Sequence, residues 1–261
     1  MYFFGNATTL IRYAGSTVLT DPTFLRRGEH VHLGHGMYAR REVDPACRIA
    51  ELPPLDLIVL SHHHGDRFDD VVAGELGEDL PIAIDDHAVQ QLRDQGFTGG
   101  HALETWQEQE ILRGDARLRI TSVPGKHASD HVAGVLPPVM GSMLDFYQGD
   151  AHRFRLCTTG DTLLHDRLHD IARWYPDIGL ALVHAGGTTL LGTVVTMTGE
   201  QAVRAVEVVD PRTAVPIHYD DYSVFRSGLD DLREAARNSP VAARFHCPAH
   251  GETYGFRARR S

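Results

Sequence analysis

The segment that decides the fold is Leu60-Ser61-His62-His63-His64-Gly65-Asp66-Arg67-Phe68-Asp69. It follows directly on Leu55–Leu60, a run rich in leucine, isoleucine and valine that predicts a buried strand. In an extended segment the imidazoles of His62 and His64 project to the same side, and Asp66 continues the alternation. Two imidazoles and a carboxylate suit zinc, iron or manganese. The segment therefore predicts a metal site at the end of a strand.

Further candidate ligands each follow another predicted strand: His127 after Leu118–Val123, Asp161 after Phe154–Thr158, and His218 after Ala214–Ile217. In sheet-based α/β folds, sites assemble at the carboxyl ends of strands. Asp161 alone could simply cap a turn. Because four strand ends each offer a ligand, we expect one shared metal centre. Its predicted ligands are His62, His64, Asp66, His127, Asp161 and His218.

The bulk composition narrows the class of protein. The chain has 261 residues and a formal net charge of -10, which argues against a nucleic-acid partner. The three cysteines are widely spaced and read as reduced thiols. The first residues lack the features of a signal peptide, and the apolar runs are too short to span a membrane. We therefore expect a cytoplasmic protein without a membrane partner, and its oligomeric state stays open.

Apolar runs and helical patterns alternate along the chain. Besides the strands named above, the predicted strands are Thr9–Tyr13, Thr17–Thr20, Leu180–Val183 and Ala242–His246. The predicted helices are Phe68–Gly77, Asp85–Gly96, Asp166–Trp174, Gly199–Val209 and Ser227–Asn238. Asp85 and Asp86 are expected to cap the second helix, and Thr198 with Gln201 fits a capping box. Arg26–Asp44 reads as a long loop.

This mixture predicts an α/β fold in which sheets are covered by helices. The early strands look antiparallel, whereas the later ones alternate with helices. A four-layer αββα sandwich satisfies both patterns in a single domain that spans residues 1–261.

These residues resemble the metallo-β-lactamase superfamily, whose signature is a His-x-His-x-Asp-His loop followed by a distant His, Asp and His. The stretches Gly5–Ile11, Leu19–Pro22, His184–Thr188 and Met197–Ala202 look like the branch that contains ascorbate-6-phosphate lactonase. The resemblance implies a metallo-β-lactamase sandwich. It also implies a first metal site at His62, His64 and His127, a second site that includes Asp66 and His218, and a bridging role for Asp161.

Arg67 departs from this signature, because the family has a histidine at its position. A guanidinium has only donors and stays protonated, so Arg67 cannot bind a cation. It is expected to weaken the second site, which makes a mononuclear enzyme possible. Alternatively, Arg67 forks onto Asp66 or Asp161, clamps an anionic substrate group, or points to solvent.

Other polar residues are expected near the site. Asp21 follows a strand and could orient a ligand imidazole. His184 could form part of the site wall, and His63 alternates away from the ligands. The loop histidines are candidates for substrate contact: His30, His32 and His35.

The expected activity is hydrolysis of a small ester, lactone, amide or phosphoester. A cation held by three histidines with an open position lowers the pKa of a bound water to about 7. Asp161 or Asp66 would orient that water and accept its proton. Zinc is the expected metal, as one or two ions, with manganese or iron as alternatives. The competing interpretations are a metal-dependent oxidoreductase and a degenerate metal-binding protein in which Arg67 has abolished catalysis.

Overall fold

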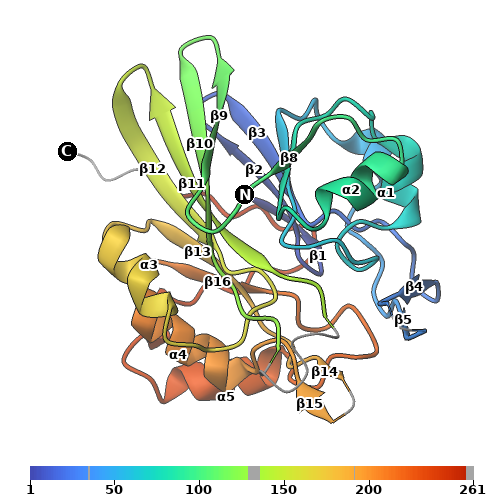
Figure 1. Ribbon diagram of the computed structural model, residues 1–261. Coiled ribbons are helices and arrows are strands. Elements are labelled where there is room, and N and C mark those ends of the chain that lie inside the picture. The colour runs from blue at the N-terminus through green and yellow to red at the C-terminus, as the bar shows by residue number, and fades with distance from the viewer. Residues whose placement is uncertain (35, 129–135, 191, 257–261) are drawn as a thin grey trace.

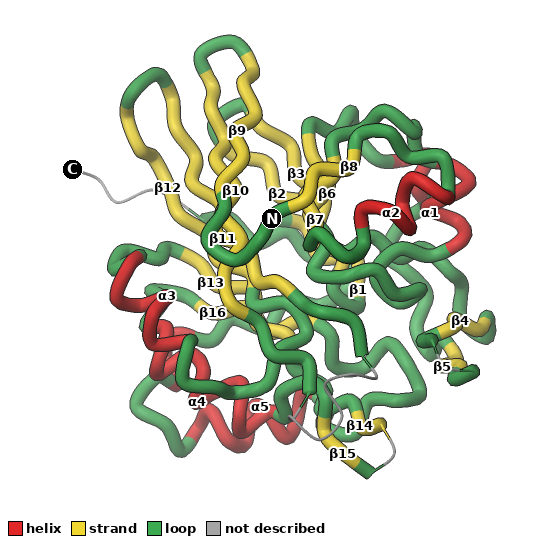
Figure 2. Tube along the Cα trace, in the orientation of Figure 1, coloured by secondary structure: helices red, strands yellow, loops and turns green. Residues whose placement is uncertain are grey.

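The computed structural model describes residues 1–34, 36–128, 136–190 and 192–256. Two six-stranded sheets face each other, and helices cover the outer face of each (Figure 1, Figure 2). The α/β fold and the αββα layering predicted from the sequence are thereby confirmed.

The first sheet has the strand order β1-β2-β3-β6-β7-β8. Its strands are β1 (Tyr2–Gly5), β2 (Thr8–Tyr13), β3 (Ser16–Thr20), β6 (Leu57–Val59), β7 (Ile82–Ile84) and β8 (Gly100–Ala102). The pairs β1–β2 and β2–β3 are antiparallel, whereas β3, β6, β7 and β8 run parallel. The short helices α1 (Asp70–Glu75) and α2 (Val89–Asp94) cover this sheet.

The second sheet has the order β16-β13-β12-β11-β10-β9. Its strands are β9 (Glu108–Arg113), β10 (Ala116–Pro124), β11 (Met140–Gln148), β12 (Ala151–Thr158), β13 (Leu180–His184) and β16 (Ala214–Ile217). Strands β9 to β12 are antiparallel, and β12, β13 and β16 are parallel. Helices α3 (Leu168–Trp174), α4 (Gly199–Val209) and α5 (Leu229–Arg237) pack on its outer side.

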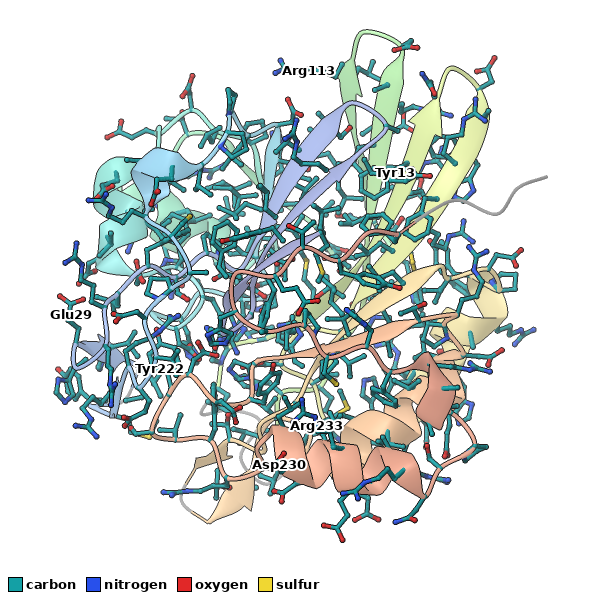
Figure 3. The ribbon with its side chains drawn as sticks, turned by 180° about the vertical axis from the view of Figure 1, so that it is seen from behind. Tyr13, Glu29, Arg113, Tyr222, Asp230 and Arg233 are labelled. Atoms are coloured by element: carbon teal, nitrogen blue, oxygen red, sulfur yellow. The ribbon has the colours of Figure 1, made fainter. Side chains whose placement is uncertain are left out.

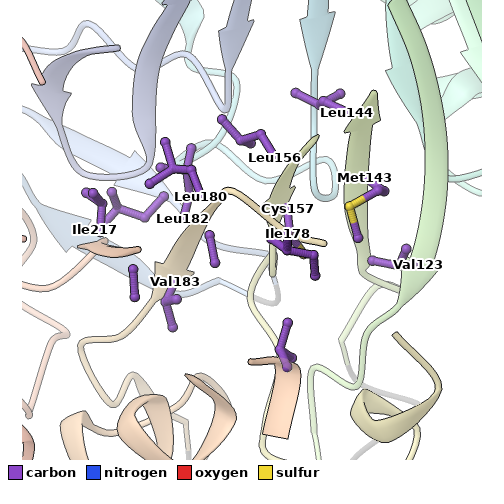
Figure 4. Close-up of a cluster of buried hydrophobic side chains, with 14 of the residues drawn as sticks. Val123, Met143, Leu144, Leu156, Cys157, Ile178, Leu180, Leu182, Val183 and Ile217 are labelled. Carbon is purple, nitrogen blue, oxygen red and sulfur yellow. The ribbon is translucent and has the colours of Figure 1, made fainter. Parts of the chain in front are cut away.

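Apolar side chains between the layers hold the sheets together. Leu57 and Val59 point from the first sheet into the same buried cluster as Leu156, Leu180 and side chains of the second sheet. Figure 4 shows part of this cluster around β11, β12 and β13. A separate cluster, which includes Ile58, lies between the first sheet and its helices. The alternation of neighbouring residues between two clusters is what a strand covered on both faces requires.

The structure corrects three expectations. Ala242–His246 is not a strand: Ala242–Arg244 forms a 3₁₀ turn, and only Phe245 makes a bridge, to Ala214. Alanine packs poorly on a pleated surface, so this alanine-rich segment has little reason to extend. Neither Asp85 nor Asp86 caps α2, because its N-cap is Ala88 and no side chain caps it. The expected loop Arg26–Asp44 contains a hairpin.

That hairpin consists of β4 (His30–His32) and β5 (Tyr38–Arg40). A second small hairpin is formed by β14 (Thr189–Leu190) and β15 (Thr193–Val194). Within the described part of the chain, no helix is long and apolar enough to cross a membrane.

Candidate metal centre

The predicted ligands His62, His64 and His127 lie together in the structure. His62 and His64 follow β6 of the first sheet, and His127 follows β10 of the second. Their candidate ligand atoms lie within 4.8 Å of one another. Nε2 of His62 is 3.0 Å from Nδ1 of His64, close to the roughly 3.3 Å expected for two nitrogens on one tetrahedral zinc ion. These three imidazoles fit a transition metal.

Hydrogen bonds behind two of the imidazoles, those of His62 and His127, leave one nitrogen of each of these rings free. The Ser61 hydroxyl lies 3.1 Å from Oδ1 of Asp21 and 3.1 Å from Nδ1 of His62. Because the hydroxyl donates to the Asp21 carboxylate, its oxygen can accept from Nδ1–H of His62, which leaves Nε2 unprotonated. The carbonyl of Val195 lies 3.0 Å from Nδ1 of His127 and orients that ring in the same way.

The remaining predicted ligands form a second group. The ligand atoms of Asp66, Asp161 and His218 also lie within 4.8 Å of one another, and all three side chains are buried. The expectation that Asp161 and His218 meet, despite their distance along the chain, agrees with this arrangement. His218 has a φ of 61°, a conformation that residues other than glycine adopt at a cost.

Arg67 fills the centre of this second group. Its guanidinium is fully buried and donates to the carbonyl oxygen of Asp66 at 2.7 Å and to Oδ2 of Asp66 at 2.8 Å. It also donates to Oδ2 of Asp161 and, at 2.7 Å, to Nε2 of His218. Of the alternatives that the sequence left open for Arg67, the fork onto the carboxylates is the one observed. The alternative in which the guanidinium points to solvent is wrong, because the Arg67 side chain is fully buried.

The residues present do not fit a second metal ion in this group. Oδ2 of each carboxylate and Nε2 of His218 already accept hydrogen bonds from Arg67. Nδ1 of His218 faces the carbonyl of Ala185 at 3.2 Å, so it carries the proton and cannot bind a cation. Of the carboxylate oxygens in this group, only Oδ1 of Asp66 and Oδ1 of Asp161 are buried without a hydrogen-bond partner among the described residues.

The local charges follow from burial and from Arg67. Burial lowers the pKa of His64 to about 4 and also lowers the pKa values of His62 and His127, so these imidazoles are neutral at pH 7. Burial would raise the pKa of Asp66, but the adjacent guanidinium brings it to about 2. Arg67 outweighs burial at Asp161 too, and holds its pKa well below the ordinary value. Neutral nitrogens and ionised carboxylates are the forms that bind a cation.

A narrow cavity of about 60 Å³ opens onto both groups of ligands. Its lining includes His64, His127, Asp66 and Asp161, and the other described residues around it are apolar side chains and threonines. These are Leu33, Met37, Leu136, Thr188, Thr189, Val195 and Val224. Arg67 is absent from this described lining.

The hairpin β4–β5 forms one side of the cavity. It packs directly on the loop that carries His62 and His64. Val31 of the hairpin lies so close to Gly65 that a Cβ added to this glycine would be only 2.4 Å from the Val31 side chain. Arg41, just after β5, is buried and donates to Asp221 at 3.3 Å. Its guanidinium also lies 5.1 Å from the ring centroid of Tyr222, which Figure 3 shows on the same side of the molecule as Glu29. The segment that the sequence predicted to be a loop therefore contains a hairpin, which these contacts hold in place beside the cavity.

Other residues singled out in the sequence lie around the centre. His63 turns away and contacts Gln95 at 3.1 Å. His184 is buried behind the site, with its ring centroid 5.8 Å from that of His218. His30 and His32 are exposed on β4, and His35 lies outside the described residues. The role of Ser61 between Asp21 and His62 was missed, although its place immediately before a ligand histidine was a usable signal.

Comparison with known proteins agrees with this geometry. Residues 16–219 match the β-lactamase superfamily domain. The chain is 26% identical to a metal-dependent hydrolase of Salinibacter ruber over 234 residues, which cover 89% of this chain and 90% of the relative. It is also 26% identical to one of Methanopyrus kandleri over 266 residues, covering 96% of each. The crystal structure of isothiocyanate hydrolase from Delia radicum gut bacteria has the same fold, with a TM-score of 0.82, 21% identity and 99% coverage of both chains. The chain belongs to the metallo-β-lactamase superfamily and is a metal-dependent hydrolase.

Proposed function

We propose that this hydrolase uses one metal ion, held by His62, His64 and His127, to cleave a small uncharged substrate. The observation that carries the proposal is the cavity beside these imidazoles, which is narrow and has largely apolar walls. Zinc is the proposed metal because its preference for nitrogen ligands in a tetrahedral arrangement matches three imidazoles with one open position. Manganese and iron accept the same residues.

When bound, such a metal supplies Lewis acidity and an activated water. Asp161 is placed to orient that water, because it lines the cavity and its Oδ1 has no hydrogen-bond partner among the described residues. Its other oxygen is fixed by Arg67, so the carboxylate cannot rotate freely. Its lowered pKa makes Asp161 a better acceptor of a hydrogen bond than a lasting store for the proton. Asp66 also lines the cavity, and its Oδ1 likewise has no hydrogen-bond partner among the described residues.

The walls indicate the class of substrate. A phosphoester would favour a cationic side chain in addition to the metal, and the described lining of the cavity contains no lysine or arginine. Thr188 offers a buried hydroxyl that has no partner among the described residues, and it suits one polar atom of a neutral substrate. An ester, lactone, amide or isothiocyanate combines an electrophilic carbon with an uncharged body. Isothiocyanate enters this set because a protein of the same fold hydrolyses it.

The test is a substrate panel for the zinc-loaded protein and for His127→Ala. The panel contains an aryl ester, a lactone, an anilide, a benzyl isothiocyanate and a phenyl phosphate. We expect turnover of at least one neutral compound and a loss of at least 100-fold in His127→Ala. With that compound, Thr188→Val should raise KM several-fold while Thr188→Ser stays near the unmutated value.

Two outcomes contradict the proposal. One is a preference for phenyl phosphate over every neutral compound. The other is full activity in His127→Ala after its loss of metal has been verified by elemental analysis.

A further inference from the structure

Arg67 presents its guanidinium to every member of the second ligand group. One terminal nitrogen faces Asp66, and the other faces both Asp161 and His218. These are the three side chains whose ligand atoms lie close enough together to share a metal ion. The guanidinium and a second metal ion would therefore compete for the same space and for the same lone pairs of this group.

We propose that the Arg67 guanidinium takes the place of the second metal ion, so that this chain works with one bound metal and one cation of its own. The inference rests on the proposed metal site at His62, His64 and His127. It adds that the second position is already filled by a residue of the chain and that this residue sets the metal content of the protein.

The charges and the lone pairs support this assignment. Asp66 and Asp161 bring two negative charges into a buried place, and Arg67 neutralises one of them without any ion from solution. His218 accepts from the guanidinium through its unprotonated nitrogen, as it would bind a metal. A dication entering this group would have to displace three hydrogen bonds and remain beside a fixed positive charge.

Arg67 differs from the other large buried cation of the site region, Arg41. Arg41 is equally buried and pairs with Asp221, but its further partners are the hydroxyls of Thr23 and Tyr222 and the carbonyl oxygen of Val43. Asp221 belongs to no group of metal-ligating side chains among the described residues. Arg41 is therefore the matched control: it is a buried arginine whose removal frees a carboxylate but no ligand set.

The experiment counts metal in Arg67→His, Arg67→Ala, Arg41→Ala and the unmutated protein. Each metal-free protein is titrated with Zn²⁺ by calorimetry, and its metal content is checked by elemental analysis. We expect one equivalent in the unmutated protein and in Arg41→Ala. We expect two in Arg67→His, with the second bound at least ten-fold more tightly than any second ion in the unmutated protein.

Unfolding temperature provides a second readout that needs no activity. Arg67→Ala leaves two buried carboxylates facing each other, so its metal-free form should unfold at a lower temperature than the unmutated protein. Excess Zn²⁺ should restore more stability to Arg67→Ala than to Arg41→Ala, because only the former gains a ligand set. If Arg67→Ala does not fold, Arg67→His still decides the metal count.

The outcomes separate this inference from the proposed function. Two equivalents of equal affinity in the unmutated protein overturn the role of Arg67. So does a folded Arg67→His that binds no second ion. If the unmutated protein binds no metal and His62→Ala behaves identically, the proposed metal site itself is wrong. A single equivalent that His62→Ala abolishes, together with a gain in Arg67→His, supports both.

Discussion

Asp21 lies behind the candidate metal site and is connected to it through Ser61. Its Oδ1 accepts from the backbone N–H of Ser61 at 2.7 Å and from the Ser61 hydroxyl, and its Oδ2 lies 3.3 Å from Nε2 of His184. The carboxylate therefore fixes the first residue of the ligand loop and, through a hydroxyl, the tautomer of His62. Asp21 is a positioning residue whose effect should appear in metal affinity.

We expect Asp21→Asn to weaken the affinity for Zn²⁺ by about ten-fold or more, because the amide is a poorer acceptor for the Ser61 hydroxyl. The matched control is Asp145→Asn, which removes a buried carboxylate that contacts His152 at 2.6 Å on the second sheet. Asp145→Asn should lose stability and keep its Zn²⁺ affinity. Equal affinities in the unmutated protein and Asp21→Asn, measured by competition with a chelating dye, would contradict this role.

At this scale the sequence identified the candidate ligands that the structure brings together, but not the residues that support them. His62, His127, Asp161 and His218 all follow strands, and position along a strand is visible in a sequence. The contact of Ser61 with Asp21 spans 40 positions of chain and depends on two parallel strands meeting, so no local pattern reports it. For Arg67, four outcomes were open from the sequence because only packing decides which carboxylates a long side chain reaches.

Among the elements, α4 shows when local sequence suffices. Its bounds were predicted as observed, because Thr198 and Gln201 form a capping box at its start and Asp210 ends it in a left-handed conformation. Strand β9 was missed because its exposed, charged sequence lacks an apolar alternation. Strand β11 was missed because it is buried on both faces and contains glycine and serine.

The connection between β7 and α2 contains a buried carboxylate, Asp85, whose charged form lowers the stability of the folded protein. Asp85 is buried, and burial raises its pKa to about 6 from an ordinary 3.8. Its Oδ1 accepts from the N–H of His87 at 3.0 Å, but its Oδ2 has no hydrogen-bond partner among the described residues. The folded state therefore favours the protonated carboxyl, so Asp85 reduces stability as the pH rises from about 4 through 6.

We expect Asp85→Asn to be more stable than the unmutated protein at pH 8, by up to about 3 kcal/mol, which corresponds to this difference in pKa. The gain should vanish near pH 4, where both proteins carry a neutral group. Asp86→Asn, at the exposed neighbour, should show little change at either pH. Urea unfolding at pH 4 and pH 8 checks this, and a gain that is the same at both pH values would argue against the buried charge as its cause.

On the scale of the whole molecule, the candidate metal site brings side chains of the two sheets together. His62 and His64 extend from β6 and His127 from β10, so one ion would bind both layers at the edge where the parallel strands end. The layering itself was predictable, since it follows from the alternation of apolar runs and helices. The order of strands within each sheet was not, because pairing between strands distant in the chain leaves no periodic signal.

Removal of the metal should therefore loosen the whole fold. We expect a chelator to lower the unfolding temperature by ~5–10 °C in a single transition, as for a ligand present at about 100 times its Kd in a chain of this size. The imidazole of His63 faces Gln95, so His63→Ala should show the same fall in unfolding temperature with chelator. His64→Ala should not show this fall. The unfolding temperature is measured by scanning calorimetry after complete metal loss has been verified. An unchanged unfolding temperature would contradict a metal ion that bridges the two sheets.

The position of Arg67 affects how strongly the enzyme depends on the supply of metal ions. A cation encoded in the chain is present from synthesis, cannot be extracted by a competing protein and is not exchanged for another ion. Only one position of the centre then depends on what the surroundings provide. Activity should rise with free metal along a simple hyperbola, without the sigmoidal lag of a centre that must collect two ions. When this metal is scarce, the activity of this enzyme should therefore fall more gradually than that of an enzyme that requires two ions.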